Sequence, residues 1–266
     1  MLYGLVEGKV KIKSGNQDYI AFGRGKKNLI ISMGLSIKEL KGSGPALLLK
    51  YKIFADEYRV YFFDRRRMVY DGITNWDLAE DIYQAMNELK VETADVVGIS
   101  QGGMIAMALT LEHPERVSRL VLAVTSSRTN KSVTDTVTKW VEYANKRDHV
   151  SINKEIYERM YSEQYLNKRK LIIPIIARSK KPKNFERFAR LASATLCFNC
   201  YDRLQEIKCP VFVIGGEKDK LTTPQEARAI AEKLNCDIHM YPQYGHAAFA
   251  EAKDFNSRVL EFLKKT

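Results

Sequence analysis

Hydrophobic and polar positions alternate along this chain with two different periods. Short apolar runs indicate strands, whereas residues 76–89 carry apolar side chains at helical spacing. The turn residues Ser14-Gly15-Asn16 predict that the first two strands form an antiparallel pair. The expected strands are 6–13, 19–24, 28–32, 59–63, 95–99, 120–124, 211–215 and 237–241, and the expected helices are 45–58, 76–89, 103–111, 223–234 and 251–265.

Strands and helices thus alternate over most of the chain, which predicts an α/β fold with a mostly parallel central sheet flanked by helices. The alternation stops between residues 127 and 203, where helical patterns and many charges occur without a convincing strand. A chain of 266 residues fits one domain with an insertion. We therefore expect a core formed by residues 1–126 and 204–266, and a helical cap, or lid, formed by residues 127–203.

Positive charge is concentrated in the expected cap. The formal net charge of the chain is +11, and residues 127–203 hold 17 Lys and Arg against 8 Asp and Glu. A nucleic-acid-binding protein would show a basic stripe with interleaved aromatic residues and a matching module, and neither is recognisable. Two interpretations stay open: a solvated face, or a positive field that attracts anionic substrates or an anionic surface.

Cysteine and hydropathy patterns point to no metal site and no membrane span. Cys197 and Cys200 have the spacing of a zinc or redox pair, but no second pair and no neighbouring histidine pair complete such a site. No stretch approaches the roughly 18 apolar residues of a membrane helix. The first residues lack the features of a secretory signal. We therefore expect a cytoplasmic protein that uses no metal.

The segment Gly98-Ile99-Ser100-Gln101-Gly102 is the first candidate for chemistry. This Gly-x-Ser-x-Gly pattern lies between an apolar strand and a helix, where small residues permit a sharp, strained turn. Ser100 would stand at the tip of that turn, next to the positive end of the helix. The pattern therefore predicts that Ser100 is a nucleophile.

A serine nucleophile needs a base, and the four histidines differ in their expected positions. Catalytic groups of a parallel sheet gather at the carboxyl ends of its strands. His246 follows the last expected strand and meets this condition. His113 precedes a strand and belongs to the opposite edge, His239 lies within a strand, and His149 lies in the charged cap.

The acid that orients the base must come from the same edge of the sheet. Asp219 lies just beyond the expected strand 211–215, and Glu217 is a near competitor. The loop after the strand 120–124 offers no carboxylate. The chain order Ser100, Asp219, His246 is the order found in α/β-hydrolases.

In these features the chain resembles the α/β-hydrolase superfamily, in particular its small esterase and enol-lactonase-like members with a helical cap. The resemblance rests on residues 98–103, residues 113–117 leading into 120–122, residues 216–219, and Gly245-His246. It implies a catalytic triad in which Ser100 is the nucleophile, Asp219 the acid and His246 the base. Glu217 then matches a non-catalytic position.

The resemblance also implies an oxyanion hole made of two backbone N–H groups. One belongs to Gln101, and the other to Leu35 in the loop after the third strand. Relatives usually have His-Gly in that loop, whereas this chain has Met33-Gly34.

Another departure is Asp64-Arg65-Arg66-Arg67, where relatives tend to have a glycine-bearing loop. These arginines are expected at the same sheet edge as Ser100. They either form a rim that attracts carboxylate or phosphate groups or are exposed without a role. Together with Trp140 and Tyr143 of the cap, Arg65 is a candidate for substrate binding.

The expected chemistry is two-step acyl transfer through an acyl-enzyme, without metal or organic cofactor. The expected partner is a small or medium carboxylic ester, neutral or anionic, and not a nucleic acid. An enol-lactone, a lysophospholipid or a substrate of carbon–carbon bond hydrolysis remains an alternative on the same triad. An alternative of another class is a non-catalytic protein of this fold that binds a ligand.

Overall fold

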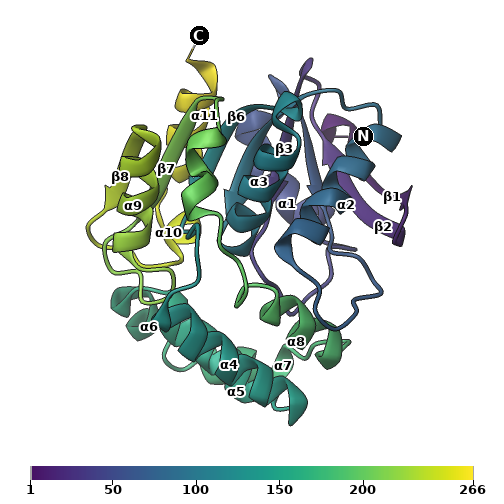
Figure 1. Cartoon of the computed structure of the whole chain (residues 1–266). Coiled ribbons are helices and arrows are strands. Elements are labelled where there is room, and N and C mark those ends of the chain that lie inside the picture. The colour runs from purple at the N-terminus through teal and green to yellow at the C-terminus, as the bar shows by residue number, and fades with distance from the viewer. Residues whose placement is uncertain (1, 266) are drawn as a thin grey trace.

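The computed structural model describes residues 2–265 and is built around one eight-stranded sheet (Figure 1). The strand order is β1-β2-β4-β3-β5-β6-β7-β8. Strand β2 pairs antiparallel with β1 and with β4, and every other pairing is parallel. The strands are β1 (Val6–Ile12), β2 (Gly15–Phe22), β3 (Lys27–Ser32), β4 (Tyr58–Phe63), β5 (Ala94–Ile99), β6 (Val117–Ala123), β7 (Val211–Gly216) and β8 (Asp237–Tyr241). The α/β class and the mostly parallel sheet predicted from the sequence are confirmed.

Helices cover both faces of the sheet, and alternate residues of each strand pack against them. Ile30 and Val96 face one layer, whereas their neighbours Leu29 and Val97 face the other. The first layer contains α2 (Asn75–Glu88), α3 (Gln101–Glu112) and α9 (Pro224–Leu234), and the second contains α1 (Gly44–Tyr51), α10 (Ala248–Glu251) and α11 (Phe255–Lys264).

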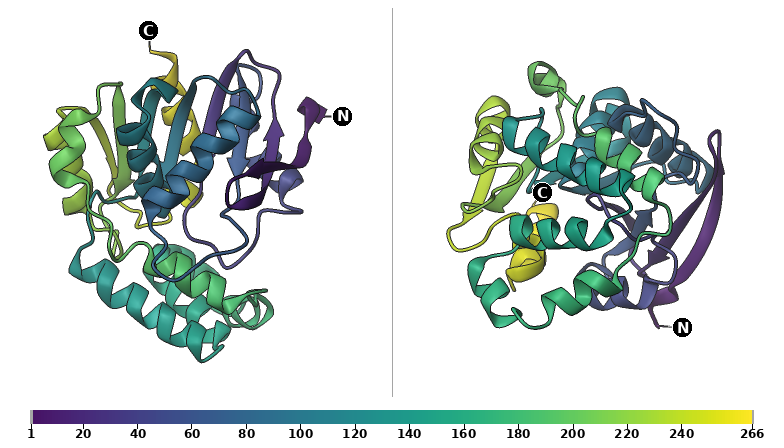
Figure 2. Two further views of the ribbon diagram at one scale, coloured as in Figure 1. Left: turned by 45° about the vertical axis from the view of Figure 1, so that its right-hand side comes forward. Right: turned by 90° about the horizontal axis from the view of Figure 1, so that it is seen from below.

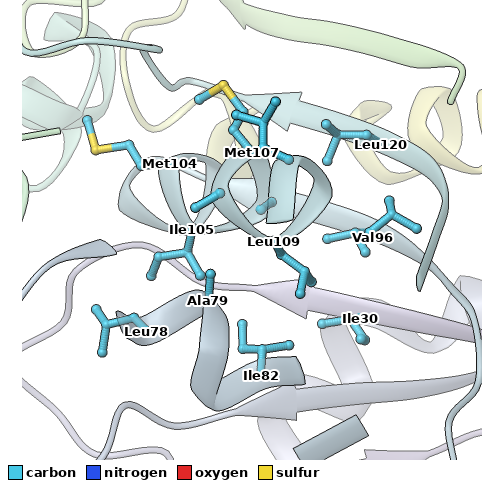
Figure 3. Close-up of a cluster of buried hydrophobic side chains, with 14 of the residues drawn as sticks. Ile30, Leu78, Ala79, Ile82, Val96, Met104, Ile105, Met107, Leu109 and Leu120 are labelled. Carbon is cyan, nitrogen blue, oxygen red and sulfur yellow. The ribbon is translucent and has the colours of Figure 1, made fainter. Parts of the chain in front are cut away.

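Helix α3 lies at the centre of the first layer. Every residue from Gln101 to Leu111 is buried, because α2 packs on one side of the helix and the sheet on another (Figure 3). This explains why its sequence lacks a polar face. A helix held on so many sides fixes the position of its own first turn, which follows Ser100.

Five helices lie between β6 and β7, below the carboxyl ends of the parallel strands (Figures 1 and 2). We call residues 131–193 the helical segment. The chain leaves and re-enters the core side by side, because Arg128 and Asn199 form an isolated antiparallel bridge. The helices are α4 (Lys131–Asn145), α5 (His149–Met160), α6 (Glu163–Lys168), α7 (Ile173–Ser179) and α8 (Phe185–Ser193).

Two helices are shorter in the structure than the sequence predicts. The helix expected at 45–58 ends at Tyr51, and a short 3₁₀ turn (Lys52–Phe54) follows, because buried Tyr58 already begins β4. The helix expected at 251–265 begins only at Phe255, as α11, whereas Glu251 ends the short α10. Between these two helices, the Asp254 carboxylate accepts a hydrogen bond from the Tyr241 hydroxyl at 3.1 Å.

The second strand begins earlier than the sequence predicts. Strand β2 begins at Gly15 rather than at residue 19, because the hairpin turn consists only of Lys13 and Ser14. Gly15 adopts φ +116°, a conformation that favours glycine and lets the chain reverse at once. No helix in the described part of the chain is long and apolar enough to cross a membrane.

The arginine loop after β4 is fixed by ion pairs with two different elements. Arg66 makes two hydrogen bonds to the Asp81 carboxylate of α2, at 2.7 and 2.8 Å, and both side chains are largely buried. Arg67 binds Asp18 of β2 at 2.6 Å. These two side chains therefore hold the loop in place, and only Arg65 turns toward the centre of the sheet edge.

We predict that Asp81→Ala destabilises the protein by about 3–5 kcal/mol, because Arg66 would keep a buried charge without its partner. The measurement is urea unfolding followed by circular dichroism. Asp135→Ala is the matched control: it removes an exposed helical ion pair with Lys131, and the expected change is within about 1 kcal/mol. Equal effects of the two substitutions would contradict this account of the loop.

Candidate active site

Ser100 occupies a sharp turn between β5 and α3. Its backbone has φ 56° and ψ −124°, a strained conformation that costs on the order of 1–3 kcal/mol for a residue with a side chain. The Ser100 N–H donates to the carbonyl of Ala123 at 2.9 Å, and Thr125 Oγ1 donates to the carbonyl of Ser100 at 2.8 Å. Bonds to β6 and the following loop thus hold the strained residue from both sides.

Gly102 makes this turn sterically feasible. A Cβ atom at this position would lie 1.9 Å from the carbonyl oxygen of Ser32 and 2.6 Å from that of Met33. Both contacts are with backbone at the end of β3, which cannot rotate away. Helix α3 can therefore approach β3 only because residue 102 has no side chain.

Three side chains from separate loops meet at the carboxyl edge of the sheet. His246 Nε2 lies 2.9 Å from Ser100 Oγ, and His246 Nδ1 lies 2.9 Å from Asp219 Oδ2. His246 is 1% exposed and Asp219 is 6% exposed, whereas Ser100 is only partly buried. The arrangement can move a proton from the serine hydroxyl to the ring, with the carboxylate behind the ring.

Asp219 is held as a charged acceptor by its own loop. Its Oδ1 accepts hydrogen bonds from the N–H groups of Leu221 and Thr222, and its Oδ2 accepts one from the Thr222 hydroxyl at 2.8 Å. Burial alone would raise the pKa of this carboxyl, but the facing His246 ring and these donors outweigh it and lower the pKa. Asp219 is therefore ionised at neutral pH.

The helical segment contacts the His246 loop directly. The N–H of Ala247 donates to the carbonyl of Met160, at the end of α5, at 2.7 Å. Ser162, which caps α6, donates through its N–H and its hydroxyl to the Glu251 carboxylate at 3.0 and 2.6 Å. The position of the His246 loop therefore depends on the helical segment as well as on the core.

The other histidines and the competing acid lie away from this cluster. His113 stacks on the Tyr83 ring beyond α3, at the opposite edge of the sheet. His149 begins α5, and His239 lies within the edge strand β8. Glu217 forms an ion pair with Arg228. The structure brings Ser100, Asp219 and His246 together, whereas the other three histidines and Glu217 lie outside this cluster.

Leu35 and Gln101 are the two residues whose N–H groups the resemblance assigns to an oxyanion hole. Both residues line the cavity at Ser100, and neither N–H donates to a protein acceptor within residues 2–265. The Gln101 side chain is turned away and donates to the carbonyl of Leu191 at 2.6 Å. Gly34 keeps the loop close, since a Cβ there would lie 3.1 Å from the Ser100 Cβ.

A cavity of about 380 Å³ opens beside Ser100 and His246. Trp140 and Arg65 line it, as the sequence predicts. Tyr143 is not among the lining residues and packs among the helices of the helical segment, so its contact with substrate stays a prediction. The remaining lining is mostly apolar, with Leu35, Leu40, Leu47, Phe63, Ile99, Ile156, Met160, Leu191, Leu221 and Phe249.

Arg65 places a cation in the wall of this cavity. One terminal nitrogen donates to the carbonyl of Met33 at 2.6 Å, whereas the buried Nε has no partner. Burial lowers the pKa of its guanidinium to about 10, partly offset by Asp64, so the group is charged at neutral pH. The Asp64 carboxylate is itself occupied, because it accepts hydrogen bonds from Leu40 N–H and from Arg187.

Two neighbours of the site were missed by the sequence analysis. Thr222 lies three residues after Asp219, and this spacing of a hydroxyl and a carboxylate in a loop is a signal of mutual hydrogen bonding. Arg187 of α8 lines the cavity but lies among many basic residues of its segment, so no local pattern distinguishes it.

No group of three or more His, Cys, Asp and Glu side chains in the described chain could hold a metal ion. The two cysteines of the Cys-x-x-Cys pair are both unbridged, and they differ in environment. Cys197 is exposed, whereas Cys200 is buried with its sulfur 3.8 Å from that of Met107. Cys200 therefore belongs to the core.

Comparisons with known proteins bear on the family and the fold of the chain. A family model described as the alpha/beta hydrolase fold matches residues 41–253. The chain is 27% identical to RutD from a Caulobacter species, a protein named for carbamate hydrolysis, over 90% of this chain and 91% of that protein. It is 29% identical to a 2-hydroxy-6-oxononadienedioate/2-hydroxy-6-oxononatrienedioate hydrolase of Burkholderia vietnamiensis, over 68% of this chain and 65% of that protein.

Solved structures show the same fold at lower identity. The enol-lactonase of Burkholderia xenovorans superposes with a TM-score of 0.85 at 18% identity, over 97% of this chain and all of that one. An esterase of Thermogutta terrifontis gives a TM-score of 0.81 at 19% identity, over 97% of this chain and 98% of that one.

We predict that Gly102→Ala destabilises the protein by about 3 kcal/mol, because the added methyl group would overlap backbone atoms of β3. Gly215→Ala is the matched control. Its Cβ would meet the flexible Met240 side chain at 3.2 Å and the Ala227 Cβ at an ordinary contact distance of 3.8 Å, so the expected change is within about 1 kcal/mol. Urea unfolding of both variants measures the difference, and a stable Gly102→Ala protein would contradict the predicted close approach.

Proposed function

The chain belongs to the α/β-hydrolase family, and from this premise we propose that it is a serine hydrolase that cleaves a small or medium carboxylic ester. The observation that carries the proposal is the continuous contact from Ser100 Oγ through the His246 ring to Asp219, with 2.9 Å at each step. This contact lies at the wall of a cavity large enough for such a substrate.

The proposed reaction has two steps. His246 Nε2 takes the hydroxyl proton while Ser100 Oγ attacks the acyl carbon, and the same ring then gives that proton to the leaving alcohol. Water next attacks the acyl-enzyme by the same route and releases the acid and the free serine. Asp219 accepts the Nδ1–H of the ring, which fixes the tautomer and stabilises the charged ring.

The N–H groups of Leu35 and Gln101 are the proposed donors to the oxyanion of each tetrahedral intermediate. Backbone donors need no particular side chain, so the departure to Met33 in this loop does not disturb them. Loss of one such donor typically lowers kcat by a factor on the order of 10²–10³. Trp140 and the aliphatic lining are proposed to hold the acyl or alkyl group.

We propose in addition that the substrate carries a carboxylate that pairs with Arg65. This guanidinium is charged, its Nε is buried, and the only hydrogen bond of its side chain within residues 2–265 is to a neutral carbonyl. A carboxylate would satisfy its free N–H groups with charge-assisted bonds.

The Arg65 cation in the cavity wall also favours carbon–carbon bond hydrolysis as a second candidate reaction. The relative from Burkholderia vietnamiensis is named for a dienedioate, a substrate with two carboxylates. Both candidate reactions require the same three residues.

We predict that a fluorophosphonate probe labels the wild-type protein at Ser100 and that Ser100→Ala is not labelled. His246→Ala and Asp219→Asn should lower ester kcat/KM by about 10³-fold or more while the melting temperature stays nearly constant. His149→Ala, which alters a histidine far from the cavity, is the control and should stay active. An unlabelled wild-type protein would instead indicate a non-catalytic ligand-binding protein.

We predict that Arg65→Gln lowers kcat/KM for carboxylate-bearing esters by about 10–100-fold, the value of one charged hydrogen-bonding group. Neutral esters of the same size should change by less than about threefold. Lys41→Gln is the control, because it removes an exposed charge that follows the cavity residue Leu40 but lies outside the lining. An equal loss for both classes of ester would show that Arg65 only supports the Met33 loop and would contradict an anion site.

A further inference from the structure

The longest stretch without negative charge lies in the helical segment, far from the triad in sequence. Between Glu163 and Glu186 the chain contains no acidic residue. This stretch covers α6, the turn after it and α7, at the end of the molecule opposite the C-terminus (Figure 1). It carries seven cations, Lys168, Arg169, Lys170, Arg178, Lys180, Lys181 and Lys183.

Most of these cations have no carboxylate partner. Lys183 pairs with Glu39 at 2.9 Å, whereas none of the other six lies within ion-pair distance of an acidic group in the described part of the chain. Lys180 donates instead to the Tyr157 hydroxyl at 2.9 Å, and Arg169 lies over the Tyr165 ring. The field of this stretch is therefore not neutralised within the protein.

Exposed aliphatic side chains lie in the middle of these cations. Leu171 is 85% exposed, Ile172 53% and Ile175 66%. Nine large hydrophobic side chains are exposed among the described residues, and these three fall within five positions. Their apolar surface remains in contact with water in the isolated protein, and this contact is unfavourable. Burial of the same surface against a partner would therefore be favourable.

We infer that residues 168–183, which we call the basic–apolar surface, dock on the surface of an anionic lipid bilayer. Leu171, Ile172 and Ile175 would enter the boundary between headgroups and acyl chains, while the lysines and arginines contact anionic headgroups. Apolar residues flanked by basic residues are the pattern of interfacial membrane segments, and the two contributions reinforce each other.

The charge argues against other occupants. A second copy of the chain would bring two sets of unpaired cations together. A nucleic acid would match the cations, but aliphatic side chains add nothing to phosphate contacts. An anionic bilayer, which is negative at its surface and apolar beneath, uses both features.

Docking would also orient the cavity. Helix α6 follows Met160, which lines the cavity and holds the His246 loop through its carbonyl. The basic–apolar surface thus begins a few residues beyond a wall of the cavity, on the side of the molecule seen from below in Figure 2. A bilayer at this surface would bring apolar compounds close to the cavity, whether or not the protein hydrolyses them.

The test is sedimentation of the full chain with vesicles of phosphatidylcholine alone or with added phosphatidylserine. We expect binding only to the anionic vesicles and weaker binding at high salt. Lys168→Gln/Lys170→Gln should lower the partition coefficient about 25-fold, at about fivefold for each cation. Leu171→Ser/Ile175→Ser should lower it at least about tenfold, because apolar insertion is lost.

The controls alter the same residue types elsewhere. Lys9→Gln/Lys11→Gln removes two exposed cations from β1, and Leu49→Ser replaces a side chain that is 71% exposed on α1. Both should bind like the wild type. No binding to anionic vesicles, or equal losses in the controls, would overturn the inference. A third outcome is that the lysine changes weaken binding while Leu171→Ser/Ile175→Ser leaves it intact. This result would overturn the inference in favour of a purely ionic partner, such as a nucleic acid.

Discussion

The close packing of α3 against the end of β3 is the constraint on which the site depends. The strained backbone at Ser100 is held by hydrogen bonds to Ala123 and Thr125 on one side and by a fully buried helix on the other. Because the core holds this turn, the Ser100 hydroxyl has a fixed direction before any ligand arrives. Asp219 and His246 then need only come from loops at the same edge of the sheet, and the parallel pairing of β5, β6, β7 and β8 places their ends there.

Charge divides the molecule into parts with different roles. Arg66 and Arg67 are neutralised by acids of neighbouring elements and hold a loop in place. Arg65, which follows the same strand, has no such acid and faces the cavity. The cations around α7 form a third group, because all of them except Lys183 lack a carboxylate partner in the described chain and they lie on the outside. Three groups of basic residues thus contribute to folding, to the proposed substrate site and to the proposed lipid surface.

Local patterns were enough to predict the α/β class with its mostly parallel sheet and the positions of Ser100, Asp219 and His246 at one edge. Strand β8 has the predicted bounds, since five residues between clear turn signals leave little choice. The catalytic roles of the three residues remain predictions, although the structure places their side chains in contact. Features that depend on distant contacts were not predictable. The end of α1 is fixed by buried Tyr58, and the start of α11 follows Asp254, which accepts a hydrogen bond from Tyr241. Tyr143 packs among the helices of the helical segment, a contact between elements that its local sequence does not reveal.

The paired crossing between core and helical segment has a consequence for how the two parts are coupled. Cys200 N–H donates to the carbonyl of Ser127 at 2.8 Å, and Thr129 N–H donates to that of Phe198 at 3.0 Å, so the two ends of the inserted chain already touch. Because its two ends meet, a change in the length of the helical segment need not move β6 or β7. Doubling that length would add only about 0.6 kcal/mol of closure entropy. The sheet and the segment that lies below its carboxyl edge are thus only weakly coupled through the chain connections between them.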